Sequence, residues 1–209
     1  MAQTEFDQSA CDQLAQCVRD IEAETDAEIV IVVRARSGSY RHADYLTGAL
    51  VAFVALLFLL FLPVEFHLYW IPLDVLLFFI LGAYLSSRTS AIRRLMTTKK
   101  FRADAVREGA AAMFYEAGIA NTENEMGVLI YLSLLERRLE LIADRGVLKA
   151  APPLEWNERL FELRQAGRRP QMKTLIESLR AMGELLAKVL PPTGENPNEL
   201  PDMPRFDLK

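Results

Sequence analysis

Two long apolar runs lie close together in this chain of 209 residues, and they restrict its folds more than any other feature. Residues 45–64 carry no formal charge, and residues 66–87 carry one, on Asp74. A helix needs about 20 apolar residues to cross the roughly 30 Å hydrocarbon core of a bilayer. We therefore expect residues 45–87 to form a transmembrane helical hairpin. A buried soluble hairpin is the alternative, but too little chain would remain to cover it.

Lys and Arg residues flank this expected hairpin on one side, whereas the link between the two runs contains none. They are Arg34, Arg36 and Arg41 before it and Arg88, Arg93, Arg94, Lys99, Lys100 and Arg102 after it. The positive-inside rule then predicts a multi-pass protein of the cell inner membrane with both termini in the cytoplasm. Asp74 is expected to be an interfacial carboxylate at a helix start, in preference to a proton-relay or ion site.

The charge distribution argues against nucleic acid as a partner. The net charge is -4 and the isoelectric point is about 5.4, whereas dedicated nucleic-acid binders are usually basic. The first 33 residues are strongly acidic, and the basic residues gather around the apolar runs, where anionic lipid would attract them. The expected partner on this evidence is the lipid bilayer.

The remaining chain predicts one α/β domain that the hairpin interrupts. β-branched and apolar runs predict strands at 28–34, 127–133 and 139–143, the last two as an antiparallel pair. Apolar residues at helical spacing predict helices at 5–25, 89–118, 154–166 and 171–190, the first capped by Thr4. Residues 1–41 and 89–190 should therefore fold together as a small sheet flanked by helices. Residues 191–209 hold five of the ten prolines and predict an extended tail.

Two stretches of sequence resemble the TPM domain family. They are AEIVIVV at 27–33 and GVLIYLSLLERRLELIADRGV at 127–147, where Gly127, Glu136, Arg137 and Asp144 are the most specific positions. The family includes a thylakoid acid phosphatase, photosystem II repair proteins and an auxiliary protein of a neuronal receptor. The resemblance covers residues 5–36 and about 100–190, and it implies a helper of larger membrane complexes. A bacterial membrane variant with two inserted spans fits this pattern.

The turns expected to hold calcium or process phosphate differ from those of many family members. Glu125-Met126-Gly127 replaces an Asp-Asn-Gly-like turn, and residues 144–148 are poor in glycine. Three carboxylates remain near the ends of adjacent strands, and they could hold Ca²⁺ or Mg²⁺ through hard oxygen ligands: Glu123, Glu125 and Asp144. Arg145 could contact a phosphate. Ordinary solvated turn acids are the preferred interpretation of this group. Glu136, Arg137 and Arg138 are expected to form a solvated turn in which Glu136 pairs locally.

No motif for nucleotide binding, serine hydrolysis or zinc proteolysis is present, so no catalytic residue is predicted. The leading hypothesis is an inner-membrane protein that presents its α/β domain to the cytoplasm as an accessory module for an unidentified membrane complex. The alternative is a divalent-metal-dependent, membrane-associated phosphatase in which Glu125 and Asp144 hold the ion. A pore or transporter is disfavoured, because two spans offer one carboxylate and no lined pathway.

Overall fold

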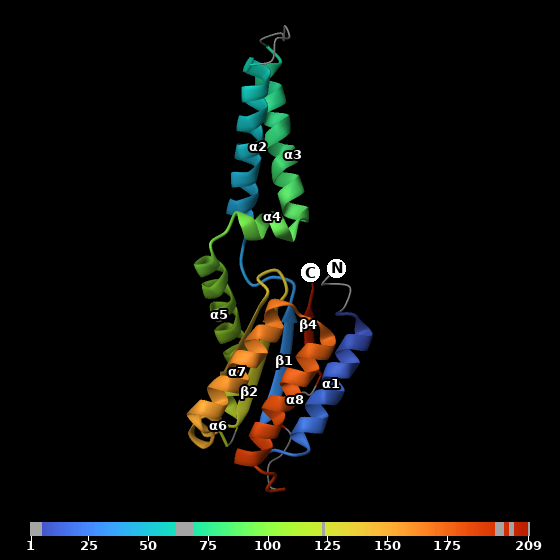
Figure 1. Ribbon diagram of the computed structural model, residues 1–209, viewed down its shortest axis with the longest axis vertical. Helices are drawn as coiled ribbons and strands as arrows, with labels where there is room; N and C mark the ends of the chain where they lie inside the picture. Colours follow the sequence, from blue (N-terminus) through green and yellow to red (C-terminus); the bar gives the residue numbers. More distant parts are fainter. Residues whose placement is uncertain (1–5, 62–68, 123, 195–198, 201–202, 209) are drawn as a thin grey trace. The chain divides into compact units, whose positions relative to one another are not determined.

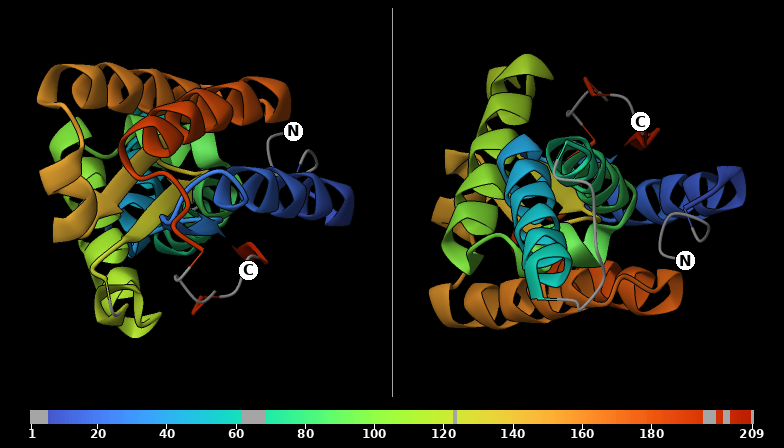
Figure 2. Two further views of the ribbon diagram at one scale, coloured as in Figure 1. Left: turned by 90° about the horizontal axis from the view of Figure 1, so that it is seen from below. Right: turned by 90° about the horizontal axis from the view of Figure 1, so that it is seen from above.

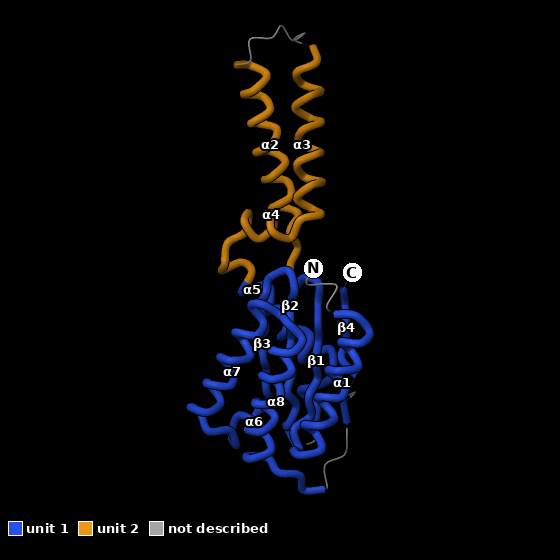
Figure 3. Tube along the Cα trace, turned by 45° about the vertical axis from the view of Figure 1, so that its right-hand side comes forward, with its two compact units in different colours: residues 1–37, 103–209 blue, residues 38–102 orange. Residues whose placement is uncertain are grey.

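The chain forms two compact units in a computed structural model, which describes all residues except 1–5, 62–68, 123, 195–198, 201–202 and 209. The first unit combines residues 1–37 with 103–209, and the second comprises residues 38–102 (Figure 3). The boundaries thus fall at 37 and 102, whereas the sequence suggested 41 and 89. The difference arises because the residues that follow the second apolar helix cluster with the helical hairpin.

The first unit contains a four-stranded mixed sheet with helices around it (Figure 1). Its strands are β1 (Glu28–Arg34), β2 (Gly127–Ser133), β3 (Arg138–Ala143) and β4 (Arg205–Asp207). Its helices are α1 (Gln8–Glu22), most of α5 (Lys99–Glu116), the short 3₁₀ turn Ile119–Asn121, α6 (Arg145–Ala150), α7 (Pro153–Arg168) and α8 (Met172–Val189). The predicted α/β class, with a small sheet flanked by helices, is confirmed.

The sheet order is β3-β2-β1-β4, so the two most apolar strands occupy its centre. β1 and β2 are parallel, with Glu28 opposite Gly127 and Arg34 opposite Ser133. β2 and β3 form the predicted antiparallel pair, and β4 lies parallel to β1. All of β2 and all but the last residue of β1 are buried, as expected for strands covered on both faces.

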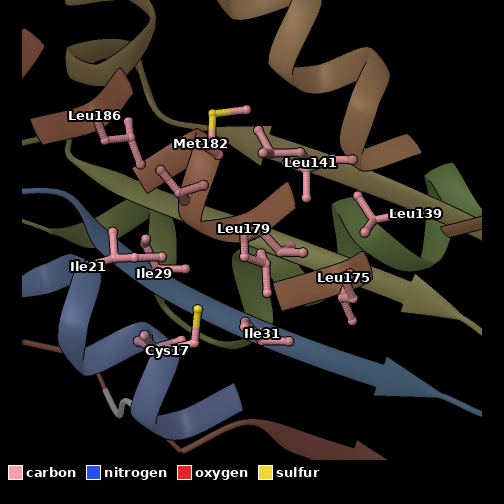
Figure 4. Packing of buried hydrophobic residues seen from close by; sticks show 14 of the residues in the cluster. Cys17, Ile21, Ile29, Ile31, Leu139, Leu141, Leu175, Leu179, Met182 and Leu186 are labelled. Atoms are coloured by element: carbon pink, nitrogen blue, oxygen red, sulfur yellow. The ribbon is translucent and has the colours of Figure 1, made fainter. Parts of the chain in front are cut away.

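Helices cover both faces of the sheet (Figure 2). On one face, α1, α7 and α8 pack against β1, β2 and β3, and Figure 4 shows side chains of α1 and α8 that meet side chains of β1 and β3 there. On the other face, α5 packs its buried Val106, Ala110 and Phe114 against β1 and β2. The polar N-terminal helix and the C-terminal helix pair are therefore held together by one continuous core.

Three details differ from the sequence-based expectations, each for a local reason. Asp7 caps α1, and the Asp7 carboxylate accepts a hydrogen bond from the Ala10 amide at 3.0 Å. The predicted cap, Thr4, lies outside the described residues. The expected helix 89–118 is broken at Thr97 and Thr98, whose hydroxyls bond to nearby backbone groups and so end α4 and start α5. Residues 145–150, for which the sequence predicts no helix or strand, form α6.

The tail also contributes to the fold. Its β4 adds to the edge of β1, and Phe206 packs edge-on against Phe6 with ring centroids 6.2 Å apart. Asp207 forms an ion pair with Arg34 at 3.2 Å. Closer to α8, the Thr193 amide and hydroxyl both donate to the carboxylate of Asp26. Short polar and aromatic contacts therefore hold a segment whose apolar content is too low to predict any strand.

The second unit is a helical hairpin with a short third helix. It comprises α2 (Arg41–Phe61), α3 (Ile71–Arg88), α4 (Ser90–Leu95) and the first residues of α5. Both α2 and α3 are long and apolar enough, by length and composition, to cross a membrane. Two glycines, which have no side chain, allow these helices to pack closely. A Cβ on Gly48 would lie 2.7 Å from the Phe79 carbonyl oxygen, and a Cβ on Gly82 would lie 2.9 Å from the Val51 Cβ. Most of their large apolar side chains remain exposed.

Candidate functional site

The loops before β2 and after β3, where the sequence predicts a metal site, are bonded to each other. The Asp144 amide donates to the Gly127 carbonyl at 2.9 Å, and the Gly146 amide donates to the Glu125 carbonyl at 3.0 Å. A Cβ on Gly146 would lie 2.7 Å from the carbonyl oxygens of Asn124 and Glu125, so glycine permits this close approach. The structure therefore brings the predicted Glu125 and Asp144 to one edge of the sheet, while Glu123 lies outside the described residues.

The two described carboxylates have different surroundings. Asp144 caps α6, and its Oδ1 accepts a hydrogen bond from the Arg145 amide at 2.7 Å. Its Oδ2 is buried and accepts no hydrogen bond from any described residue. The Glu125 carboxylate is half-exposed and lies 4.0 Å from the Lys149 ammonium, on a backbone with φ of 54°. A buried carboxylate oxygen without a donor is a costly arrangement that a bound cation would relieve.

The donor set at these loops is nevertheless small. Within the described parts of the chain, no group of three or more His, Cys, Asp or Glu side chains is placed to hold a metal ion. The oxygens present at these loops are the Asp144 carboxylate and the backbone carbonyls of Asn124 and Glu125, and oxygens of this kind suit a hard cation such as Ca²⁺ or Mg²⁺.

A second polar cluster, not predicted from the sequence, lies where β1 and β2 end. Glu136 is 4% exposed, accepts a hydrogen bond from the Ser37 amide at 2.9 Å, and accepts another from the Ser133 hydroxyl. The Ser37 hydroxyl also lies 3.0 Å from the phenol of Tyr131. The expectation that Glu136 is a solvated turn acid is therefore wrong. The backbone folds back here through Arg137, with φ of 53°, and turns the carboxylate inward.

This cluster fixes the point at which the chain leaves β1. The Ser37 amide and the Ser133 hydroxyl each donate to one carboxylate oxygen of Glu136, so both oxygens of this buried group are hydrogen-bonded. Gly109 of α5 makes room for the Tyr131 hydroxyl, because a Cβ there would lie 2.7 Å from it. The sequence offers no signal for this role, since Glu136 stands beside two arginines in a stretch that resembles any charged turn.

A third polar cluster lies within the second unit and was also missed. Arg93 of α4 donates two hydrogen bonds to the Asp44 carboxylate of α2, at 3.0 and 2.7 Å. Ser86 of α3 donates to the same carboxylate at 2.8 Å, and the side chains of Arg93 and Asp44 are 12% and 11% exposed. Hydrogen bonding to Asp44 raises the pKa of the Arg93 guanidinium above its ordinary value. This cluster ties all three helices of the unit together.

The fold, an α/β arrangement with a small mixed sheet among helices, is also found in a solved structure. The NMR structure of the BA42 protein from the psychrophilic bacterium Bizionia argentinensis is similar, with a TM-score of 0.58 and 14% sequence identity. The likeness covers 96% of this chain and 94% of that one. No protein-family model and no curated protein matches the chain. At this level of identity the similarity defines the fold class alone.

Proposed function

We propose that the chain is an inner-membrane protein whose α2–α3 hairpin spans the bilayer and whose α/β domain is a cytoplasmic accessory module for a larger membrane complex. The observation that carries this proposal is the exposed apolar surface of both helices, which runs along their length from Leu46 to Phe61 and from Leu73 to Leu85. Soluble monomers rarely expose a contiguous apolar patch of more than a few hundred Å². A bilayer removes such a surface from water.

The orientation follows from the basic residues at one end of the hairpin. Residues 88–102 contain six Lys and Arg residues and no acid, whereas the described end of the link carries Tyr69 and Trp70 without a base. Basic residues are retained on the cytoplasmic side, and aromatic rings favour the interface. On this basis we propose that the α/β domain lies in the cytoplasm.

The accessory role rests on the domain surface and on the resemblance to the TPM domain family. Leu154 and Phe161 of α7 are 87% and 59% exposed, and they stand seven residues apart, hence on one side of the helix. Leu148 of α6 is exposed as well. Large apolar side chains that are exposed together on one side of an element mark protein–protein interaction sites. We therefore infer that this side of α7 binds the partner.

The proposal predicts a stable membrane partner. Affinity purification of the full-length protein in mild detergent, followed by mass spectrometry, should recover a stoichiometric membrane protein. The Leu154→Ser/Phe161→Ser variant should remain in the membrane but lose about tenfold or more of that partner, because interface anchors commonly contribute over 2 kcal/mol. The control is Glu177→Gln, a change at an exposed position on α8, away from the side of α7 that carries Leu154 and Phe161. Recovery of the protein alone would contradict the accessory role.

A second candidate function, a divalent-metal-dependent phosphatase, is favoured by one observation, the buried Oδ2 of Asp144. In that case Asp144 and the carbonyls beside Gly146 would hold the ion, which would polarise a phosphate oxygen as a Lewis acid. Arg145, exposed at the start of α6, is the nearest candidate to orient a phosphate.

Metal addition separates the two functions. With the full-length protein and a generic phosphomonoester, we expect no turnover that depends on Ca²⁺ or Mg²⁺, since the described donor set is small. Glu125→Gln and Asp144→Asn should behave like the unmodified protein in this assay, as should the control Glu158→Gln. Metal-dependent turnover that both of the first two variants abolish would overturn the accessory role in favour of hydrolysis.

A further inference from the structure

The short helix α4 has an unusual position within the second unit. It follows α3 directly and lies across the ends of α2 and α3 instead of continuing along them (Figure 1). The ion pair between Arg93 and Asp44 fixes this position, together with the Thr97 hydroxyl, which donates to the Arg93 carbonyl at 2.7 Å. A helix held across the ends of two spanning helices would lie in the plane of the membrane surface.

The side chains around α4 match the composition of that surface. Leu95, at the end of α4, is an apolar side chain that is 79% exposed. Arg88, Lys99 and Lys100 lie within seven residues of it in sequence, and Arg41 starts α2 at the same end of the hairpin; all four are exposed. Among the described residues, none of these four bases forms an ion pair; Arg88 lies over the Tyr84 ring, 5.4 Å from its centroid. Apolar side chains beside basic ones are typical of interfacial helices.

The charge at this end of the hairpin is strongly one-sided. Residues 38–102 contain seven Lys and Arg, all at this end, and the acid that shares it, Asp44, is already paired with Arg93. Asp74, another acid of the unit, lies in the first turn of α3, at the opposite end. A set of bases so close to a bilayer attracts lipids of opposite charge over zwitterionic ones.

We propose that α4 and its neighbouring bases form an interfacial platform that selectively binds anionic phospholipid headgroups of the cytoplasmic leaflet. Leu95 enters the headgroup layer, and Arg88, Lys99 and Lys100 contact lipid phosphates. The Arg93–Asp44 pair positions the helix and does not itself bind lipid. This inference rests on the proposed membrane topology, since it requires α2 and α3 to be inserted.

Lipid association with the full-length protein in phosphatidylcholine bilayers tests the platform. Spin-labelled phosphatidylglycerol should associate with the protein at least fivefold more strongly than spin-labelled phosphatidylcholine, since each base near the surface contributes about that factor. Salt should reduce the preference. In Arg88→Gln/Lys99→Gln/Lys100→Gln the preference should fall close to one. The charge-matched control Arg168→Gln/Arg169→Gln/Lys173→Gln removes three exposed bases of the α/β domain and should keep it.

The outcomes distinguish this inference from the topology beneath it. Each sample is first washed at alkaline pH, and protein that remains in the vesicles is inserted. Inserted protein with equal association of the two lipids would overturn the platform alone, as would an equal loss of preference in both triple variants. Protein released by the wash would overturn the membrane topology and the platform together.

Discussion

Arg93→Ala is expected to lower the free energy of unfolding of the second unit by about 3–5 kcal/mol, the range for breaking a buried ion pair. The loss is large because the variant leaves the Asp44 carboxylate, 11% exposed, without its two guanidinium donors. The hydrogen bond from Ser86 remains, but it is too weak to offset the desolvation of a charge. Thermal unfolding of the full-length protein in mild detergent measures the effect.

Two further variants make this prediction specific. Lys99→Ala removes an exposed base from the same region and should change stability by less than about 0.5 kcal/mol. Arg93→Ala/Asp44→Ala leaves no lone charge, so it should recover much of what Arg93→Ala loses. If the double variant is as unstable as Arg93→Ala, the two side chains stabilise the unit through packing. If Arg93→Ala unfolds with the same free energy as the unmodified protein, the ion pair contributes nothing to stability.

Gly167→Ala should destabilise the α/β domain by at least about 2 kcal/mol, although glycine-to-alanine changes within helices usually stabilise by about 1 kcal/mol. A Cβ at residue 167 would lie 2.5 Å from the Leu139 Cβ and 2.8 Å from the Leu139 backbone nitrogen. Because β3 cannot move without breaking its ladder with β2, α7 would have to shift away from the sheet. Here the steric cost exceeds the gain in helix propensity. Chemical denaturation of the full-length protein gives the value.

Gly183→Ala on α8 is the matched control. A Cβ there would lie 2.7 Å from an Ile21 side-chain atom, and no backbone atom is among its nearest contacts. The Ile21 side chain can turn about 30° away from its rotamer at a cost of about 0.5–1.5 kcal/mol, so this variant should lose much less stability. Equal losses for the two variants would contradict the argument from a backbone obstruction.

The sequence predicts the helices and strands of this protein better than it predicts which strands pair with each other. The run of β-branched residues in β1 and the apolar run in β2 identify central strands, because buried strands need such side chains on both faces. The parallel pairing of β1 with β2 could not be predicted, since residues 35–126 separate them and no local signal specifies the partner. β4 was missed because three residues in a Pro-rich tail have no periodicity to detect.

The same limit applies to the polar clusters. Glu125 and Asp144 were expected near one another because each adjoins a strand end, and the structure places their loops together. Glu136 and Asp44 became buried through contacts with Ser37 and Arg93, which lie 99 and 49 residues away in sequence. Burial of that kind depends on the tertiary fold, and a side chain's own sequence environment does not show it.

The position of the hairpin between β1 and β2 also constrains how the protein is made. β1 leaves the ribosome before the hairpin, whereas both of its sheet neighbours, β2 and β4, are synthesised after it. On the proposed topology, membrane insertion therefore takes place while β1 has two open edges, and strands in that state readily join other chains. Pairing across so long a separation is slow. On this topology, we therefore expect β1 to stay unpaired until β2 arrives, and any factor that shields its edges during that interval to raise the yield of folded protein.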